Sequence, residues 1–186
     1  MNRRGLIRAL LLTGMVVAWP LAGSSVATAA PASEIRSNAE AALTRLYNQN
    51  TAARDLARKA KGVLVFPEVT KGGIGIGGSY GEGVLFVNGK PDGYYSISSG
   101  SLGLTLGAQS FSQVIMFMTQ DALNSFRNSK GWEAGVDGSV VAISEGQAAS
   151  YDTTKAQDPV VGFVFGQQGL MFDASFKGAK YTRIRR

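Results

Sequence analysis

The sequence contains neither histidine nor cysteine among its 186 residues. Without histidine, the chain lacks the imidazole base that serine and cysteine nucleophiles usually require. Without cysteine it forms no disulfide, and without either residue it lacks the ordinary ligands of zinc and other transition metals. Charged residues make up 17% of the chain, and its net charge of +6 falls short of the strong bias of a nucleic-acid-binding protein. We therefore expect a binding or structural protein rather than an enzyme, with no metal, no cofactor and no nucleic-acid partner.

Residues 1–29 have the layout of a secretory signal peptide. Arg3, Arg4 and Arg8 flank or precede an apolar run from residue 9 to roughly residue 22, and Ala27-Thr28-Ala29 offers a cleavage site. The run is shorter than the about 20 residues that a membrane-spanning helix needs. Cleavage after Ala29 would lower the net charge from +6 to +3, because the three arginines leave with the peptide. We expect an exported protein, periplasmic or secreted, and leave open the general and the twin-arginine routes.

The exported part, residues 30–186, begins with two predicted helices. The first spans residues 33–48, with Ser33 as its N-cap and an apolar stripe at helical spacing. The second begins with Thr51 as its expected N-cap and runs to about Lys61, and Gly62 is its expected C-cap. A third predicted helix follows Thr119, another expected N-cap, and ends near Asn128.

Between and after these helices the apolar pattern is typical of strands. Thirteen of the 24 glycines fall between Gly62 and Gly107, which indicates bent or closely approaching strands. Asn88-Gly89 begins a turn that we expect to extend to Gly93. The predicted strands are residues 63–66 (ended by Pro67), 72–87, 94–109, 113–118 and 132–143, followed by a polar segment at 144–159 and a hairpin of 160–165 and 170–176 turned at 167–169.

Strands in succession with helices gathered at one end indicate an α+β fold. We expect one domain, residues 30–186, with a largely antiparallel, partly closed, barrel-like sheet, N-terminal helices and one inserted short helix.

Three short motifs match catalytic patterns by chance. Gly73-Ile74-Gly75-Ile76-Gly77-Gly78 fits a dinucleotide loop, but a strand follows it where that site needs a helix. Gly77-Gly78-Ser79-Tyr80-Gly81 fits a nucleophile elbow, but the chain has no histidine to act as base. Tyr151-Asp152-Thr153-Thr154-Lys155 fits a dehydrogenase pair without the repeated strand–helix units of that fold.

The basic residues are the more informative set. They gather in the second helix and in the last ten residues, and either group could meet anionic lipid headgroups or form a solvated surface. The first helix could likewise insert its apolar face into a membrane or dock on the sheet. The candidate lipid-binding residues are Arg54, Arg58, Lys59, Lys61, Lys177, Lys180, Arg183, Arg185 and Arg186, and the candidate membrane-facing residues are Ile35, Leu43, Leu46 and Tyr47.

The segment from Thr119 to Phe126 resembles the SYLF domain, also called the yeast actin-patch actin-binding domain. Four further segments fit that pattern in the expected order, and the resemblance spans roughly residue 35 to the C-terminus. Asp173 departs from it, and no Src-homology-3 domain follows. The four segments are Ala60-Lys61-Gly62, the glycine strand through Gly77, Gly81, Glu82, Gly83 and Val84, Gly169-Leu170, and Gly178.

The resemblance implies a β-rich domain with N-terminal helices that binds lipid through basic residues, here matching Arg58, Lys59 and Lys61. Some family members bind actin, a partner not expected for an exported bacterial chain. Two hypotheses follow. The first is a non-enzymatic module of the bacterial envelope that binds an anionic lipid surface and stays peripherally on the membrane. The second is a structural or protein-interaction module of the envelope with no lipid role, in which the first helix is packed permanently on the sheet.

Overall fold

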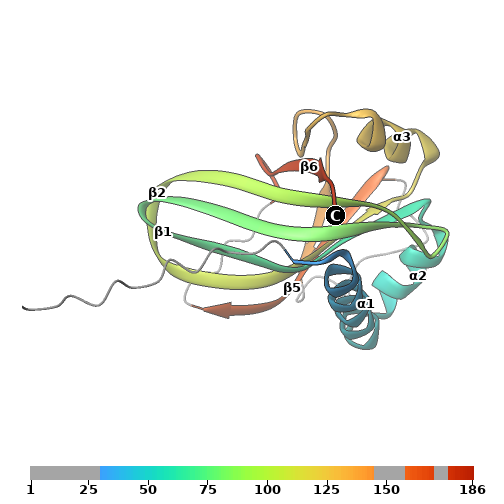
Figure 1. The fold of residues 1–186 in the computed structure, drawn as a ribbon, viewed down its shortest axis with the longest axis horizontal. Coiled ribbons are helices and arrows are strands. Elements are labelled where there is room, and N and C mark those ends of the chain that lie inside the picture. Colours follow the sequence, from blue (N-terminus) through green and yellow to red (C-terminus); the bar gives the residue numbers. More distant parts are fainter. Residues whose placement is uncertain (1–29, 145–157, 170–175) are drawn as a thin grey trace, which may run out of the picture.

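The computed structural model describes residues 30–144, 158–169 and 176–186 (Figure 1). The expected signal peptide, most of the polar segment at 144–159 and most of the last expected strand lie outside these residues. The elements are α1 (Ala32–Gln49), α2 (Thr51–Lys59), β1 (Gly62–Val87), β2 (Lys90–Phe117), α3 (Gln120–Asn128), β3 (Trp132–Glu133), β4 (Val141–Ser144), β5 (Val160–Gly169) and β6 (Lys180–Ile184).

The described strands form one mixed, mostly antiparallel sheet, which confirms the α+β class. β2 lies at its centre. β1 pairs along one edge of β2, and the path β3-β6-β2-β5-β4 joins the remaining strands. β6 and β5 share the remaining edge, because β6 pairs with residues 94–98 of β2 and β5 with residues 109–117. The β4–β5 pair is parallel and the other strand pairs are antiparallel.

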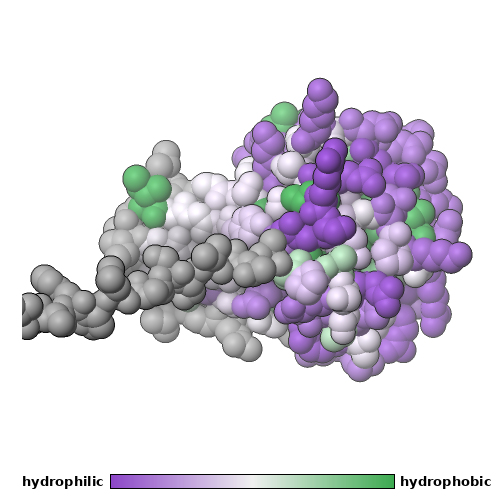
Figure 2. Space-filling model, viewed as in Figure 1, coloured by the Kyte–Doolittle hydropathy of each residue, from purple (hydrophilic) through white to green (hydrophobic). Residues whose placement is uncertain are grey.

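β1 and β2 form one long hairpin that folds back on itself (Figure 1). Asn88 and Gly89 make its turn, both with positive φ (50° and 73°), as a type I′ turn requires. The second half of β1 lies against the first, since a Cβ on Gly83 would collide with the carbonyl oxygen of Val65. Glycine therefore permits the close approach that closes the sheet into a half-barrel. In Figure 2 the end with the helices is mainly hydrophilic, whereas the coloured residues toward the opposite end are mostly pale, with one hydrophobic group.

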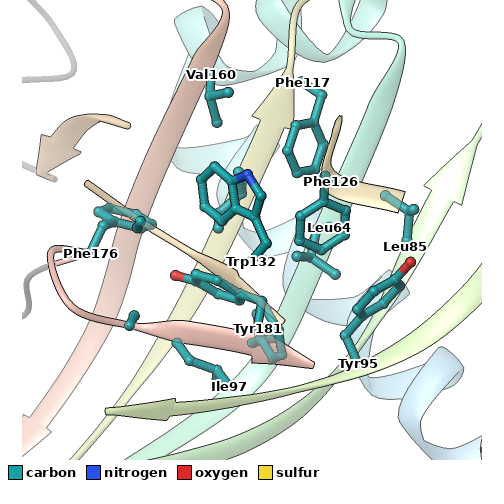
Figure 3. Close-up of a cluster of buried hydrophobic side chains, with 14 of the residues drawn as sticks. Leu64, Leu85, Tyr95, Ile97, Phe117, Phe126, Trp132, Val160, Phe176 and Tyr181 are labelled. Atoms are coloured by element: carbon teal, nitrogen blue, oxygen red, sulfur yellow. The ribbon is translucent and has the colours of Figure 1, made fainter. Parts of the chain in front are cut away.

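The two faces of the sheet bury two separate cores. Along β2, Ile115 and Phe117 face one core, and Val114 and Met116 face the other, as strand alternation requires. The first core lies inside the half-barrel and is aromatic: Trp132 and the ring of Phe126 from α3 pack with their centroids 5.8 Å apart (Figure 3). The second core lies between the sheet and the two N-terminal helices, so these helices cover the outer face of the sheet. We call the first the inner core and the second the outer core.

The helices begin and end close to the predicted positions, although three caps differ. Ala60, not Gly62, is the C-cap of α2, since its backbone N–H donates to the Leu56 carbonyl at 2.9 Å, and Gly62 already begins β1. α1 starts at Ala32 after Pro31 and has no side-chain cap, so the expected Ser33 cap is wrong. Asn50, not Thr51, caps α2, because its Oδ1 accepts a hydrogen bond from the Ala53 backbone N–H at 3.0 Å. Thr119 caps α3 as predicted. Within the described residues, no helix is long and apolar enough to cross a membrane.

Four strand predictions are corrected. Pro67 does not end a strand, because β1 continues through it. Similarly, β2 is one strand where two were expected, and its turn with β1 is shorter than predicted. β5 runs to Gly169, through the expected turn at residues 167–169. Residues 132–143 are not one strand: β3 and β4 are short and separated.

Candidate functional site

A cavity of about 370 Å³ opens between α1, α2 and the β1–β2 turn, and we call it the basic cup. It has the dimensions of a small-ligand site. Three segments of the chain line it: α1, the end of α2 with the start of β1, and the β1–β2 turn. Its lining consists of Glu40, Leu43, Tyr47, Ala57, Arg58, Ala60, Lys61, Gly62, Val63, Phe86, Asn88 and Gly89.

One wall of the basic cup is apolar. Leu43 and Tyr47 lie one helical turn apart on α1, half-buried and packed against the outer core. Val63 and Phe86 supply the facing part from β1. The Tyr47 phenol is neutral at pH 7, and burial moves its pKa further above the ordinary value, so this wall carries no negative charge. The wall can accept apolar atoms of a ligand while one side of the ligand remains in water.

The rim of the basic cup carries two cations. The Arg58 side chain is 72% exposed and pairs with Asp55 at 3.6 Å, a contact between exposed groups that contributes little stability. Lys61 is exposed, and its backbone N–H donates to the Phe117 carbonyl at 2.8 Å, which fixes the position from which its side chain extends. Both cations therefore remain accessible to an anion at the mouth of the cavity.

Glu40 is the acidic residue of the lining, and its charge is partly neutralised. Arg36 pairs with it at 3.4 Å across one turn of α1. A negatively charged ligand in the basic cup would therefore meet the Arg58 and Lys61 side chains with limited repulsion from Glu40.

The other two basic residues of α2 do not line the basic cup. Arg54 donates to the Tyr47 carbonyl oxygen at 2.7 Å and so satisfies the C-terminal end of α1. This bond ties α2 to α1 and holds the wall and the rim together. Lys59 is exposed at the last residue of α2.

The C-terminal basic residues do not form a free tail, because Lys180–Ile184 is a strand of the sheet. Arg183 lies over Gly93 and donates to the Asp92 carbonyl oxygen at 3.1 Å. Arg186 forms an ion pair with Glu82, and its side chain is 18% exposed. Arg183 is still exposed, whereas the Arg186 guanidinium is already engaged by Glu82, and the lipid-binding role of both residues stays a prediction.

The remaining members of this group differ in their surroundings. Lys177, Lys180 and Arg185 are exposed, and the aliphatic part of Lys180 crosses Gly131. None of them lines the basic cup.

The apolar residues of α1 divide in the same way. Ile35 and Leu46 are only 3% and 2% exposed and belong to the outer core. Their placement on a membrane-facing surface is corrected, because docking on the sheet already buries them. Leu43 and Tyr47 are half-buried at the basic cup.

Comparison with known proteins identifies the domain. Residues 98–185 match the family model described as "Ysc84: Las17-binding protein actin regulator", which is the SYLF family. The chain carries a SYLF domain. The resemblance seen in the sequence is thereby confirmed.

This SYLF domain is also similar to Beta cell expansion factor A of Aeromonas veronii. The two are 32% identical over 149 residues, which cover 79% of this chain and 55% of the relative. The chain thus spans about half the length of the curated relative that it matches.

Sequence reasoning found the helix side of the basic cup and missed its sheet side. Val63, Phe86, Asn88 and Gly89 reach the cavity because the hairpin folds back, and no local pattern in the sequence reports that return.

Proposed function

We propose that this SYLF domain is a non-enzymatic module that binds anionic phospholipid headgroups through the basic cup. The observation that carries the proposal is one cavity in which Arg58 and Lys61 stand beside Leu43 and Tyr47. Cations at the mouth suit a phosphate, and the apolar wall suits the first carbons beyond it. The SYLF family is a family of binding domains, which supports a binding role.

The proposed contact is shallow. α1 keeps Ile35 and Leu46 in the outer core, so membrane binding would use the rim of the basic cup without undocking the helix. Attraction between exposed cations and an anionic surface weakens with salt. We further propose that the protein acts after export, in the periplasm or outside the cell, as a peripheral membrane protein.

The second candidate is a structural or protein-interaction module of the envelope. The docking of α1 favours it, because that hypothesis expects a permanently packed first helix. Under this alternative, exposed aliphatic residues such as Ile76 and Val136, 72% and 75% exposed, would contact a protein partner.

Vesicle co-sedimentation separates the two candidates. We would compare anionic phosphatidylglycerol vesicles with neutral phosphatidylcholine vesicles at low and high salt. Arg58→Gln/Lys61→Gln should weaken binding to anionic vesicles by about 2 kcal/mol, or about 30-fold, at about 1 kcal/mol per basic residue.

The matched control is Arg127→Gln/Lys130→Gln, which removes the same charge at exposed positions in and just after α3, outside the basic cup. This control should bind nearly as well as the original protein. Equal losses in the two variants would reject the basic cup as the contact, and absence of binding to anionic vesicles would reject the lipid function.

A further inference from the structure

A second cavity, of about 550 Å³, lies between α1 and the sheet on the outer face, and we call it the bulge cavity. Two β-bulges meet there. Pro67 and Glu68 of β1 together oppose Ser112 of β2, and Gly166 with its neighbour in β5 opposes Phe111. Bulges bend a strand and redirect its side chains, and they are frequent beside binding sites. Because the two bulges oppose adjacent residues of β2, they create the space under α1.

The walls of the bulge cavity are connected by hydrogen bonds. Arg45 reaches down from α1 and donates to Ser112 Oγ at 3.3 Å, and Ser112 Oγ donates to the Pro67 carbonyl at 2.7 Å. Ser110 Oγ donates to Glu68 Oε1 at 3.3 Å. Asn38 adds an amide from the preceding part of α1. These contacts hold the polar groups in place before any ligand arrives.

The bulge cavity also contains one cation and one anion that do not neutralise each other. Arg45 belongs to the α1 wall and Glu68 to the β1 bulge, and neither forms an ion pair within the described part of the chain. A ligand that carries both an oxyanion and a cation would pair with Arg45 and Glu68 at once. An anion alone would be repelled by Glu68, and a cation alone would be repelled by Arg45.

We propose that the bulge cavity binds phosphoethanolamine, either free or as a lipid headgroup. Arg45 supplies a planar donor fork for phosphate, and the Asn38 amide offers a further donor for its remaining oxygens. Glu68 accepts from the ammonium group. Only the lipid form of this ligand rests on the proposed function, since free phosphoethanolamine needs no membrane.

The lining selects a primary ammonium over a quaternary one. Trimethylammonium groups are recognised by cages of aromatic rings. Among the described lining residues, the bulge cavity has a single aromatic side chain, the buried Phe111, and several hydrogen-bond acceptors. A primary ammonium can donate to these acceptors and phosphocholine cannot, so the two ligands should be discriminated.

Calorimetric titration of the full chain tests the site. Phosphoethanolamine should bind saturably and at least about tenfold more tightly than glycerol phosphate, ethanolamine or phosphocholine, because each lacks one charge-assisted contact. Glu68→Gln should remove this preference over glycerol phosphate, because phosphoethanolamine loses its ammonium contact while glycerol phosphate loses only a repelling like charge and binds at least as well as before. Arg45→Gln should weaken both phosphate ligands.

Arg36→Gln is the matched control, because Arg36 is exposed on the same helix and lies outside the bulge cavity. It should leave every affinity unchanged. The proposal is overturned if the original protein does not bind phosphoethanolamine, if phosphocholine binds equally well, or if Glu68→Gln behaves like Arg36→Gln. Because Glu68 is exposed at a bulge, its substitution should leave the fold intact.

A vesicle arm identifies the source of the ligand. If the ligand is the lipid headgroup, the Arg58→Gln/Lys61→Gln variant should co-sediment with neutral vesicles that contain phosphatidylethanolamine. The Glu68→Gln variant should not co-sediment with them. If the protein binds free phosphoethanolamine but not these vesicles, the bulge cavity is a binding site for the soluble compound and not for the lipid headgroup. Failure of the basic cup therefore leaves the bulge cavity testable, and the reverse also holds.

Discussion

Leu46→Ala tests whether α1 is a fixed part of the domain. Leu46 is 2% exposed and packs in the outer core with β1, β2 and β5 side chains. Truncation of a fully buried leucine costs about 2–5 kcal/mol, from lost burial and from the cavity left behind. We expect a loss of about 3 kcal/mol, which for a domain of this size corresponds to a fall of roughly 6–12 °C in the melting temperature.

The assay is urea unfolding followed by the fluorescence of Trp132, which is buried in the inner core and reports global unfolding. Leu43→Ala, on the same helix but half-buried at the basic cup, should cost clearly less. A loss below about 1 kcal/mol for Leu46→Ala would mean that α1 is not stably docked. That result would support a membrane-inserting role for Ile35 and Leu46, against which their burial argues.

Three further predictions concern the sheet and the inner core. Gly83→Ala should lower the free energy of unfolding in urea by about 3 kcal/mol, because its Cβ meets the Val65 backbone. Gly100→Ala, with open space around it, should change that free energy by less than about 1 kcal/mol, and equal effects would contradict the fold-back of β1. Tyr95→Phe should be neutral or stabilising in the same assay, because its buried hydroxyl has no hydrogen-bond partner; a loss above about 1 kcal/mol would refute this. Burial raises the pKa of Tyr181 above 10.0, so the unfolded chain loses this proton first: stability should be complete below pH 10 and fall above it, and urea midpoints measured from pH 8 to 11 should fall less in Tyr181→Phe.

The helices could be predicted because their determinants are local. The apolar stripe of α1 and the Thr119 cap of α3 lie within a few residues of the elements that they define. The expected cap of α2 was Thr51, and the residue before it, Asn50, suits that position equally well. Asn50 takes it, since it also ends α1 by donating its backbone N–H to the Leu46 carbonyl.

The strands could be predicted in kind but not in extent. Proline usually ends a strand, yet Pro67 sits in a bulge, where its missing N–H does not interrupt the ladder. The last strand was missed because its charged residues are typical of a solvated tail. Tyr181 is what places it in the sheet, since this side chain is buried among the aromatic rings of the inner core.

The candidate site could be predicted only on its helical side. Arg58 and Lys61 were recognisable as accessible cations, and Leu43 and Tyr47 as part of an apolar stripe. Their meeting in one cavity depends on the angle between α1 and α2 and on the return of the hairpin. The bulge cavity was not predicted, because the bulges depend on pairing register between strands distant in sequence.

The hairpin of β1 and β2 also sets an order of assembly for the chain. Its pairs are nested around Asn88-Gly89, so it can zip outward from a short loop with little entropic cost at each step. The other edge of β2 stays unpaired until β5 and β6 have formed, and both are synthesised after it. Until then, a long open edge is exposed to pairing with other chains, which makes the unfinished protein prone to aggregation. β5 and β6 therefore complete the sheet, and without them this edge of the central strand would remain unpaired.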